Sequence, residues 1–233
     1  MTTSAKPSLL IDRVLQLGPR LAVFDCDGTL WAGDAGEGFF DWELRRGEVS
    51  PDIVRWARNR YADYKAGKVT EDEMCGDMVT LHQGIEEREL LRTTHQFFEE
   101  NFRQAIFPEM RQLVFSLADG GCEVWAVSST NEWLIRGAME QFRIPPDRIL
   151  AASARVENGV VTNQLVRIPS GVGKAKAILE VIGRPPDLAF GNSRWDLEML
   201  SIARYAVAVN PNPDLETLAR QRGWTVYWPE GTR

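Results

Sequence analysis

Four short apolar runs recur along the chain and constrain its fold more than any other feature. They are Leu21–Asp25, Cys122–Ser128, Asp187–Phe190 and Tyr205–Val209. A run without polar alternation is typical of a strand that is buried on both faces, as in a parallel sheet. Stretches with helical character separate the runs, so the chain is predicted to build βαβ units. The expected fold class is therefore α/β, with a Rossmann-like parallel sheet as the core.

A segment with helical patterns but without such apolar runs interrupts this alternation of strands and helices after the first run. Ser50 followed by Pro51 is typical of a helix start, and two further helical patterns follow it. We therefore predict a core domain made of residues 1–33 and 107–233. The inserted residues 34–106 are predicted to form a helical cap domain that lies over the strand ends.

The charge of the chain excludes several classes of partner. Lys and Arg number 27 and Asp and Glu number 33, which gives a net charge of −6. Binders of nucleic acid or of anionic membranes depend on clustered cations, so neither partner is expected. The stretch Arg55–Lys65 mixes cations with aromatic residues, and we interpret it as an amphipathic cap helix. No apolar run approaches the ~20 residues of a membrane span, and Pro7 and Asp12 make the N-terminus a poor signal peptide.

The cysteines and histidines form no metal-binding pattern. Cys26, Cys75 and Cys122 are far apart and odd in number, which favours reduced thiols over disulfides or a zinc site. His82 and His95 have no partner at ligand spacing and are predicted to lie on helix surfaces or at caps. We expect a cytoplasmic protein, and the sequence leaves its oligomeric state open.

Polar residues follow the predicted strands, at the edge where open parallel sheets bind ligands. The residues expected to meet there are Asp25, Asp27, Ser128, Ser129, Lys174, Asn192 and Asp196. Because these residues come from distant parts of the chain, their convergence would mark a functional site.

These motifs resemble those of the haloacid dehalogenase superfamily. DxDGT follows the first run at residues 25–29, Ser128 ends a later run, and Lys174 opens a helix. Asn192 and Asp196 lie in a loop of the form G-(D/N)-x-x-x-D. The resemblance covers nearly the whole chain. The position of the helical insertion, and a hairpin signal before the lysine, fit the subgroup that contains phosphoserine phosphatase.

The resemblance implies a Mg²⁺-dependent phosphomonoester hydrolase with an aspartyl-phosphate intermediate. Asp25 would be the nucleophile, because a carboxylate needs no deprotonation at neutral pH. Asp27 would be the general acid and base, since residues i and i+2 of an extended chain point the same way. Ser128 and Lys174 would stabilise charge on the phosphoryl oxygens. The residues expected to hold or orient Mg²⁺ are Asp25, Asp27 through its backbone carbonyl, Asn192 and Asp196.

Two alternative functions remain open. Asn192 replaces the usual first acid of the fourth motif, which removes a charge from the metal site. Metal-independent haloacid dehalogenases also tend to lack that acid, but they lack the second carboxylate of the first motif as well, and Asp27 is present here. A catalytically weak binding or regulatory member is the other alternative, against which the intact Asp25, Asp27 and Lys174 argue. A phosphatase is therefore the prediction.

The substrate class is predicted from acids near the catalytic loop. Asp34 lies nine residues after Asp25, where phosphoserine phosphatases place a cap-side acid. The cap run Gly67–Met78 contains acids but no arginine that could hold a carboxylate. We predict a small phosphomonoester with a neutral or cationic remote end, such as an amino-alcohol phosphate. The alternative is that acids such as Asp77 merely solvate the outside of the cap. The predicted substrate-binding residues are Ser128, Ser129, Lys174 and Asp34.

Overall fold

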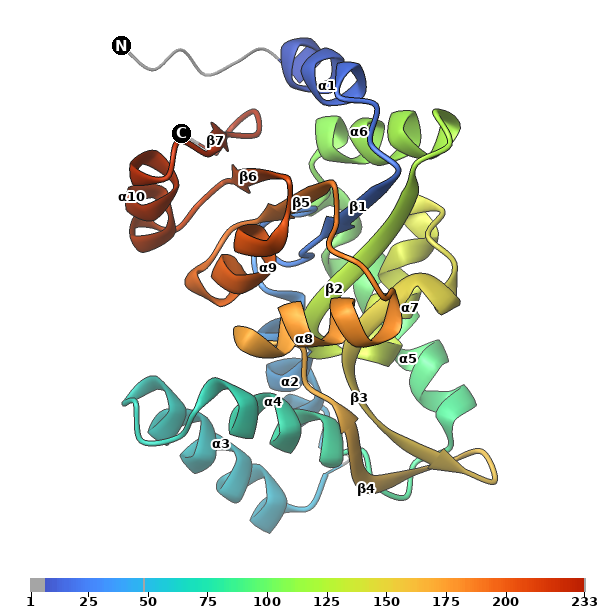
Figure 1. Ribbon diagram of the computed structural model, residues 1–233. Coiled ribbons are helices and arrows are strands. Elements are labelled where there is room, and N and C mark those ends of the chain that lie inside the picture. The colour runs from blue at the N-terminus through green and yellow to red at the C-terminus, as the bar shows by residue number, and fades with distance from the viewer. Residues whose placement is uncertain (1–6, 48, 233) are drawn as a thin grey trace.

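A seven-stranded sheet forms the centre of the protein in the computed structural model, which describes residues 7–47 and 49–232 (Figure 1). The strands are β1 (Leu21–Phe24), β2 (Glu123–Asn131), β3 (Ile149–Glu157), β4 (Val160–Arg167), β5 (Leu188–Gly191), β6 (Tyr205–Val209) and β7 (Thr225–Tyr227). Their order is β4-β3-β2-β1-β5-β6-β7, and only β3 and β4 pair antiparallel. The α/β class with a Rossmann-like parallel sheet is confirmed.

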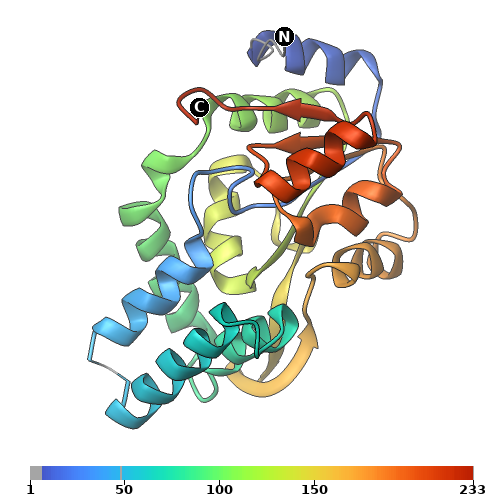
Figure 2. The same ribbon diagram turned by 90° about the vertical axis from the view of Figure 1, so that its left-hand side faces the viewer.

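Helices cover both faces of the sheet (Figure 2). They are α1 (Pro7–Gln16), α6 (Pro108–Asp119), α7 (Glu132–Met139), α8 (Val172–Val181), α9 (Leu197–Ile202) and α10 (Pro213–Gln221). Successive side chains of a strand point to opposite faces. Accordingly, Ala22 and Phe24 of β1 join the hydrophobic cluster of α1, α6 and α7. Leu21 and Val23 join that of α8, α9 and α10. None of the described helices combines the length and the apolar character that a membrane span needs.

The inserted helices are α2 (Ala35–Arg45), α3 (Pro51–Lys65), α4 (Glu71–Thr80) and α5 (Glu87–Asn101). Ser50 caps α3 by accepting from the Ile53 N–H, as its sequence predicted. Helix α2 was not predicted; Asp34 is its N-cap and accepts from the Glu37 N–H at 2.8 Å. Helices α3 and α4 lie at one end of the molecule, near the β3–β4 hairpin (Figure 1).

The inserted helices share part of the main core. Phe40, Leu44, Ala57, Val69 and Met74 form a small hydrophobic cluster that joins α2, α3 and α4. By contrast, the buried face of α5 belongs to the cluster that also holds β1 and α7. The division into a core and a cap at residues 34 and 106 stays a prediction.

The β3–β4 hairpin ties the insertion to the sheet. Asn158 and Gly159 at its tip have φ of 51° and 80°, as a two-residue Asn-Gly hairpin turn requires. The carbonyl oxygens of Gly159 and Val161 accept from the N–H groups of Glu87 and Gly84, at 2.9 Å each. The loop between α4 and α5 is thus fixed against the hairpin.

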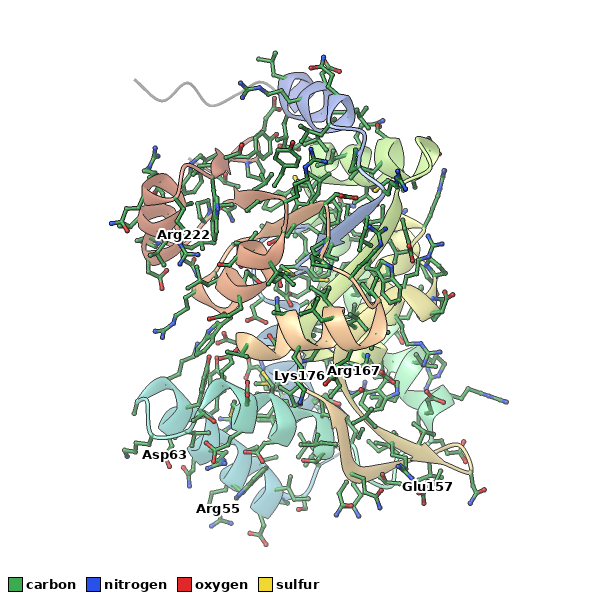
Figure 3. The ribbon with its side chains drawn as sticks, in the orientation of Figure 1. Arg55, Asp63, Glu157, Arg167, Lys176 and Arg222 are labelled. Carbon is green, nitrogen blue, oxygen red and sulfur yellow. The ribbon has the colours of Figure 1, made fainter. Side chains whose placement is uncertain are left out.

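The mixed cationic and aromatic stretch forms α3, as predicted. Arg55 extends away from the molecule (Figure 3) and pairs with Asp52 at 2.6 Å. Arg60 pairs with Asp77 at 2.6 Å on the neighbouring helix α4. These pairs place a carboxylate of α3 or α4 beside each of the two arginines.

Candidate active site

A cavity of about 430 Å³ lies at the carboxyl ends of the strands. Strands β1, β2 and β5 and the start of α8 all contribute to its wall. Among its lining residues are Asp25, Asp27, Gly28, Ser129, Thr130, Lys174 and Asn192. Most of the polar residues that the sequence predicted to meet at this edge are therefore brought together.

Asp25 is a fixed, buried carboxylate at the end of β1. Its Oδ1 accepts from the Lys174 ammonium at 2.6 Å, and its Oδ2 accepts from the Thr29 hydroxyl at 2.8 Å. Burial and the charge of Asp196 raise the pKa of Asp25 to about 6, although Lys174 opposes them. The carboxylate is thus mainly ionised at neutral pH and held in one orientation.

Asp27 is held by donors from three segments. Its Oδ1 accepts from the Trp31 indole N–H at 2.8 Å and from the Ala35 backbone N–H at 2.6 Å. Its Oδ2 accepts from the Thr130 hydroxyl at 2.8 Å. Burial, and then the charge of Asp34, raise the pKa of Asp27 to about 7. A carboxyl group with that pKa can both give and take a proton near neutral pH.

Lys174 bridges two buried carboxylates. Its ammonium donates to Asp25 and to Asp196 at 2.6 Å each, and its side chain is 2% exposed. Burial opposes the charge on Lys174, but the two carboxylates outweigh it and raise its pKa. The second oxygen of Asp196 accepts from the backbone N–H groups of Asn192 and Ser193 at 2.9 and 3.0 Å. Asp196 therefore holds both Lys174 and the loop that carries Asn192.

The two predicted serines lie in different environments. Ser128 is buried, and its Oγ accepts from the Thr130 backbone N–H at 3.1 Å. Ser129 and Thr130 line the cavity, whereas Ser128 is not among its lining residues. Thr130 had no predicted role, yet it joins the β2 end to Asp27. The substrate-binding role of Ser128 stays a prediction.

Asp25, Asp27 and Asn192 line one cavity and carry oxygen donors of the kind that would hold a magnesium ion. A Cβ at Gly28 would come within 1.8 Å of the Asn192 amide nitrogen, so only glycine lets that amide lie against the DxDGT loop. The Asp25 carboxylate, the Asp27 carbonyl and the Asn192 amide then offer hard oxygen ligands. Among the described residues, no cluster of three or more Asp, Glu, His and Cys forms a metal site. The oxygen donors are therefore one carboxylate and two neutral carbonyl groups, which together carry little negative charge.

A smaller inner cavity of about 80 Å³ adjoins the catalytic one. The two cavities share the lining residues Asp34, Tyr64, Glu71, Ser129 and Thr130. Asp34 is thus placed where the sequence predicted, beside the catalytic loop. Glu71 was one of several acids in its run, and nothing in the sequence marked it out.

Asp77 lines neither cavity, which agrees with the alternative that this acid lies on the outside of the cap. Glu71, Met74, Cys75 and Met78 line the inner cavity at spacings of i, i+3, i+4 and i+7, which share one face of a helix. Asp77 lies on another face of α4, where it pairs with Arg60.

His82 is buried, so the surface half of its prediction was wrong, but it lies directly after Leu81, the C-cap of α4, as the cap half predicted. Its Nδ1 lies 3.1 Å from the Val79 carbonyl, and its Nε2 lies 3.0 and 3.1 Å from the Glu43 carboxylate oxygens. The Val79 carbonyl and an ionised Glu43 carboxylate are both acceptors, an arrangement that a ring with both nitrogens protonated would satisfy. Burial lowers the pKa of His82, but the charge of Glu43 and the two hydrogen bonds leave it raised.

Comparison with known proteins defines the family. The sequence model of haloacid dehalogenase-like hydrolases matches residues 22–201, and the chain belongs to that family. Phosphoserine phosphatase SerB1 of Mycobacterium tuberculosis is 31% identical, over 88% of this chain and 69% of that protein. A histidinol-phosphatase of Neisseria meningitidis is 26% identical, over 88% of this chain and 97% of that protein. Within the family, the chain is a phosphatase.

The fold is also shared with solved structures. A protein of unknown function from Bordetella pertussis has a TM-score of 0.79 and 22% identity, covering 89% of this chain and 97% of that one. A probable phosphoserine phosphatase from Vibrio cholerae has a TM-score of 0.65 and 20% identity, covering 88% of this chain and 59% of that one. Both structures are thus similar to this chain in their overall fold.

Proposed function

We propose that this phosphatase hydrolyses a small phosphomonoester through a covalent aspartyl-phosphate on Asp25. The observation that carries the proposal is that the two carboxylates, Asp25 and Asp27, are held by different hydrogen-bond partners. Asp25 is held ionised by Lys174 and Thr29, whereas burial brings the pKa of Asp27 to about 7. One group is thus suited to attack phosphorus and the other to move a proton.

The reaction has two balanced halves. An oxygen of Asp25 attacks phosphorus, the bond from phosphorus to the ester oxygen breaks, and Asp27 gives its proton to the departing oxygen. Asp27 then takes a proton from a water molecule whose oxygen attacks the aspartyl-phosphate. Inorganic phosphate leaves, and Asp25 regains its free carboxylate. Neighbouring hydrogen-bond donors hold the carboxylates of Asp25 and Asp27 in place, and this positioning supports each step.

Mg²⁺ is the proposed cofactor, held by Asp25, the backbone carbonyl of Asp27 and the amide of Asn192. When bound, it would offset the repulsion between the carboxylates and the phosphoryl oxygens. Lys174 already supplies one cation at this place, and Asp196 orients both Lys174 and the Asn192 loop. We propose Ser128, Ser129 and Lys174 as phosphoryl-binding residues.

The proposed substrate class is a small phosphorylated metabolite. Relatives named for phosphoserine and histidinol phosphate support this size range. The site supports it as well, because the cavity that adjoins the catalytic one is small, about 80 Å³.

Hydrolysis of p-nitrophenyl phosphate tests the proposal. The wild type should release phosphate, and Asp25→Asn should lower kcat/KM by at least about 10³-fold. Asp119→Asn, which removes an exposed carboxylate at the end of α6, is the matched control and should keep full activity. Full activity in Asp25→Asn would refute the mechanism. Turnover of a 2-haloacid without turnover of any phosphomonoester would favour a dehalogenase, and turnover of neither would favour a binding or regulatory member.

A further inference from the structure

Trp31 is a completely buried residue of the loop after β1, and its indole N–H donates to Oδ1 of Asp27 at 2.8 Å. The same oxygen accepts from the Ala35 backbone N–H at 2.6 Å. A carboxylate oxygen offers about two lone-pair sites, and an indole or backbone N–H can only donate. Oδ1 therefore has no free position for a proton while both hydrogen bonds are present.

The other oxygen of Asp27 has a different kind of partner. Oδ2 accepts from the Thr130 hydroxyl at 2.8 Å, and a hydroxyl can either donate or accept. Thr130 can thus donate to Oδ2 when the carboxylate is ionised, and accept from Oδ2 when that oxygen carries a proton. Asp27 and Thr130 both line the catalytic cavity, whereas Trp31 and Ala35 are completely buried. The partners of Oδ1 therefore lie in the protein interior, and the partner of Oδ2 lies at the cavity.

Packing fixes the orientation of the Trp31 ring. The ring meets Phe98 edge-on, with ring centroids 5.0 Å apart, and is tilted against Phe142 at 6.2 Å. The backbone of Trp31 also pairs with Ile106 in an antiparallel bridge. Because both the ring and the backbone are held, the indole N–H is kept in the direction of Asp27.

We propose that Trp31 is a positioning residue, which keeps Oδ2 of Asp27 as the oxygen that transfers the proton. The inference rests on the proposed phosphatase function, in which Asp27 gives a proton to the departing ester oxygen and then takes one from water. Since Trp31 and Ala35 fill Oδ1, both transfers take place at Oδ2. After the first transfer Thr130 donates to Oδ2 and stabilises the carboxylate that forms.

The dependence on the leaving group tests the role of Trp31. Trp31→Phe keeps a ring at this place but removes the donor, so Oδ1 can take up the proton and hold it away from the substrate. We expect kcat/KM for n-propyl phosphate to fall by about tenfold or more. For p-nitrophenyl phosphate, whose leaving group needs no proton, it should change by less than about threefold. A loss of folded enzyme would lower both values in proportion, so their ratio separates positioning from stability.

Trp133→Phe is the matched control for this substitution. Trp133 is also a completely buried tryptophan of the same hydrophobic cluster. Within the part of the chain that the structure describes, however, its indole N–H has no hydrogen-bond partner. Trp133→Phe should therefore keep the wild-type ratio of kcat/KM between the two esters. An equal fall in Trp133→Phe, or an unchanged ratio in Trp31→Phe, would overturn the positioning role. If the wild type hydrolyses neither ester, the phosphatase proposal itself fails.

Two variants of Thr130 test the assignment of the proton to Oδ2. Thr130→Val has nearly the same shape but no hydroxyl, and it should lower the ratio of kcat/KM for n-propyl phosphate over p-nitrophenyl phosphate by about threefold to tenfold. Thr130→Ser retains the hydroxyl and should keep the wild-type ratio. A wild-type ratio in both variants would overturn the assignment to Oδ2.

A proton NMR measurement tests the contact itself, without turnover and without the folding of Trp31→Phe. The Trp31 indole proton lies in a hydrogen bond to a carboxylate, so its resonance should lie downfield of the Trp133 indole proton. It should move upfield in Asp27→Asn, while the Trp133 resonance stays in place. A Trp31 resonance that does not respond to Asp27→Asn would overturn the proposal.

Discussion

The catalytic cavity and the inner cavity are built in different ways. Around Asp25 and Asp27, each carboxylate oxygen accepts at least one hydrogen bond, and the donors lie in the loop after β1, at the end of β2 or at the start of a helix. The inner cavity is formed by side chains from α2, α3, α4 and the end of β2, which approach one another only in the folded chain. The proposed catalytic geometry is thus fixed by short motifs at strand ends, whereas the shape of the inner cavity depends on how the inserted helices pack.

The largest effect is expected at Lys174, the cation that binds the catalytic motifs together. Lys174→Met leaves two buried carboxylates without their cation, so the free energy of unfolding should fall by about 3–5 kcal/mol. Lys176→Met on the same helix removes an exposed lysine (Figure 3) and should cost about 0–1 kcal/mol. Urea denaturation of both variants measures the difference. Similar losses in the two would mean that Lys174 does not hold the catalytic end together.

A smaller effect, confined to activity, is expected for Asp27→Asn. Loss of the general acid should slow hydrolysis of alkyl phosphates by about 10²–10⁴-fold. p-Nitrophenyl phosphate should suffer less, because its leaving group needs no proton. Initial rates across a series of leaving groups give the dependence. A uniform loss would show that Asp27 is needed for structure alone.

The stability of the folded chain should depend on pH through His82, which lines the inner cavity. Its pKa is raised in the folded state, so the stability from its pair with Glu43 is complete below the unfolded pKa of about 6.5 and is lost as pH rises through the folded pKa. His82→Gln should therefore lower the free energy of unfolding by about 1.5–3 kcal/mol near pH 5.5, and by less at alkaline pH. Chemical denaturation at several pH values checks the trend. A difference that grows with pH would contradict the imidazolium assignment.

The smallest effect is expected at Asn192, where the proposed metal site lacks one charge. Asn192→Asp should lower the Mg²⁺ concentration for half-maximal activity by about threefold to tenfold, because the added carboxylate attracts the ion. Titration of activity with Mg²⁺ after treatment with EDTA gives the two values. Activity that is indifferent to both EDTA and Mg²⁺ would rule out the proposed cofactor.

The sequence predicts the catalytic end well because its information is local. The run Leu21–Asp25 marks both a buried strand and the carboxylate that follows it, and the Asp-Gly turn places Asp27 two residues on. Lys174 and Asp196 follow from motif spacing. What spacing does not give is the bridge that Lys174 makes between Asp25 and Asp196, since that contact joins three separate parts of the chain.

The inner cavity could be predicted only in outline. The Ser50–Pro51 start and the helical patterns that follow it predicted α3 and α4, but helix periodicity does not say which face meets the pocket. Consequently Asp77 was grouped with Glu71, although the two lie on different faces of α4. The burial of His82 was also missed, because its partner Glu43 is 39 residues away on a helix that was not predicted.

The central claim is that Asp25 carries the phosphoryl group during turnover. Acid quenching of the wild type during hydrolysis of p-nitrophenyl phosphate, followed by proteolysis and mass spectrometry, tests it directly. We expect a phosphoryl group on the peptide that contains Asp25, located on Asp25 by fragmentation, and its absence in Asp25→Asn. Steady hydrolysis with an unmodified Asp25, or with the phosphoryl group on another residue, would contradict the account.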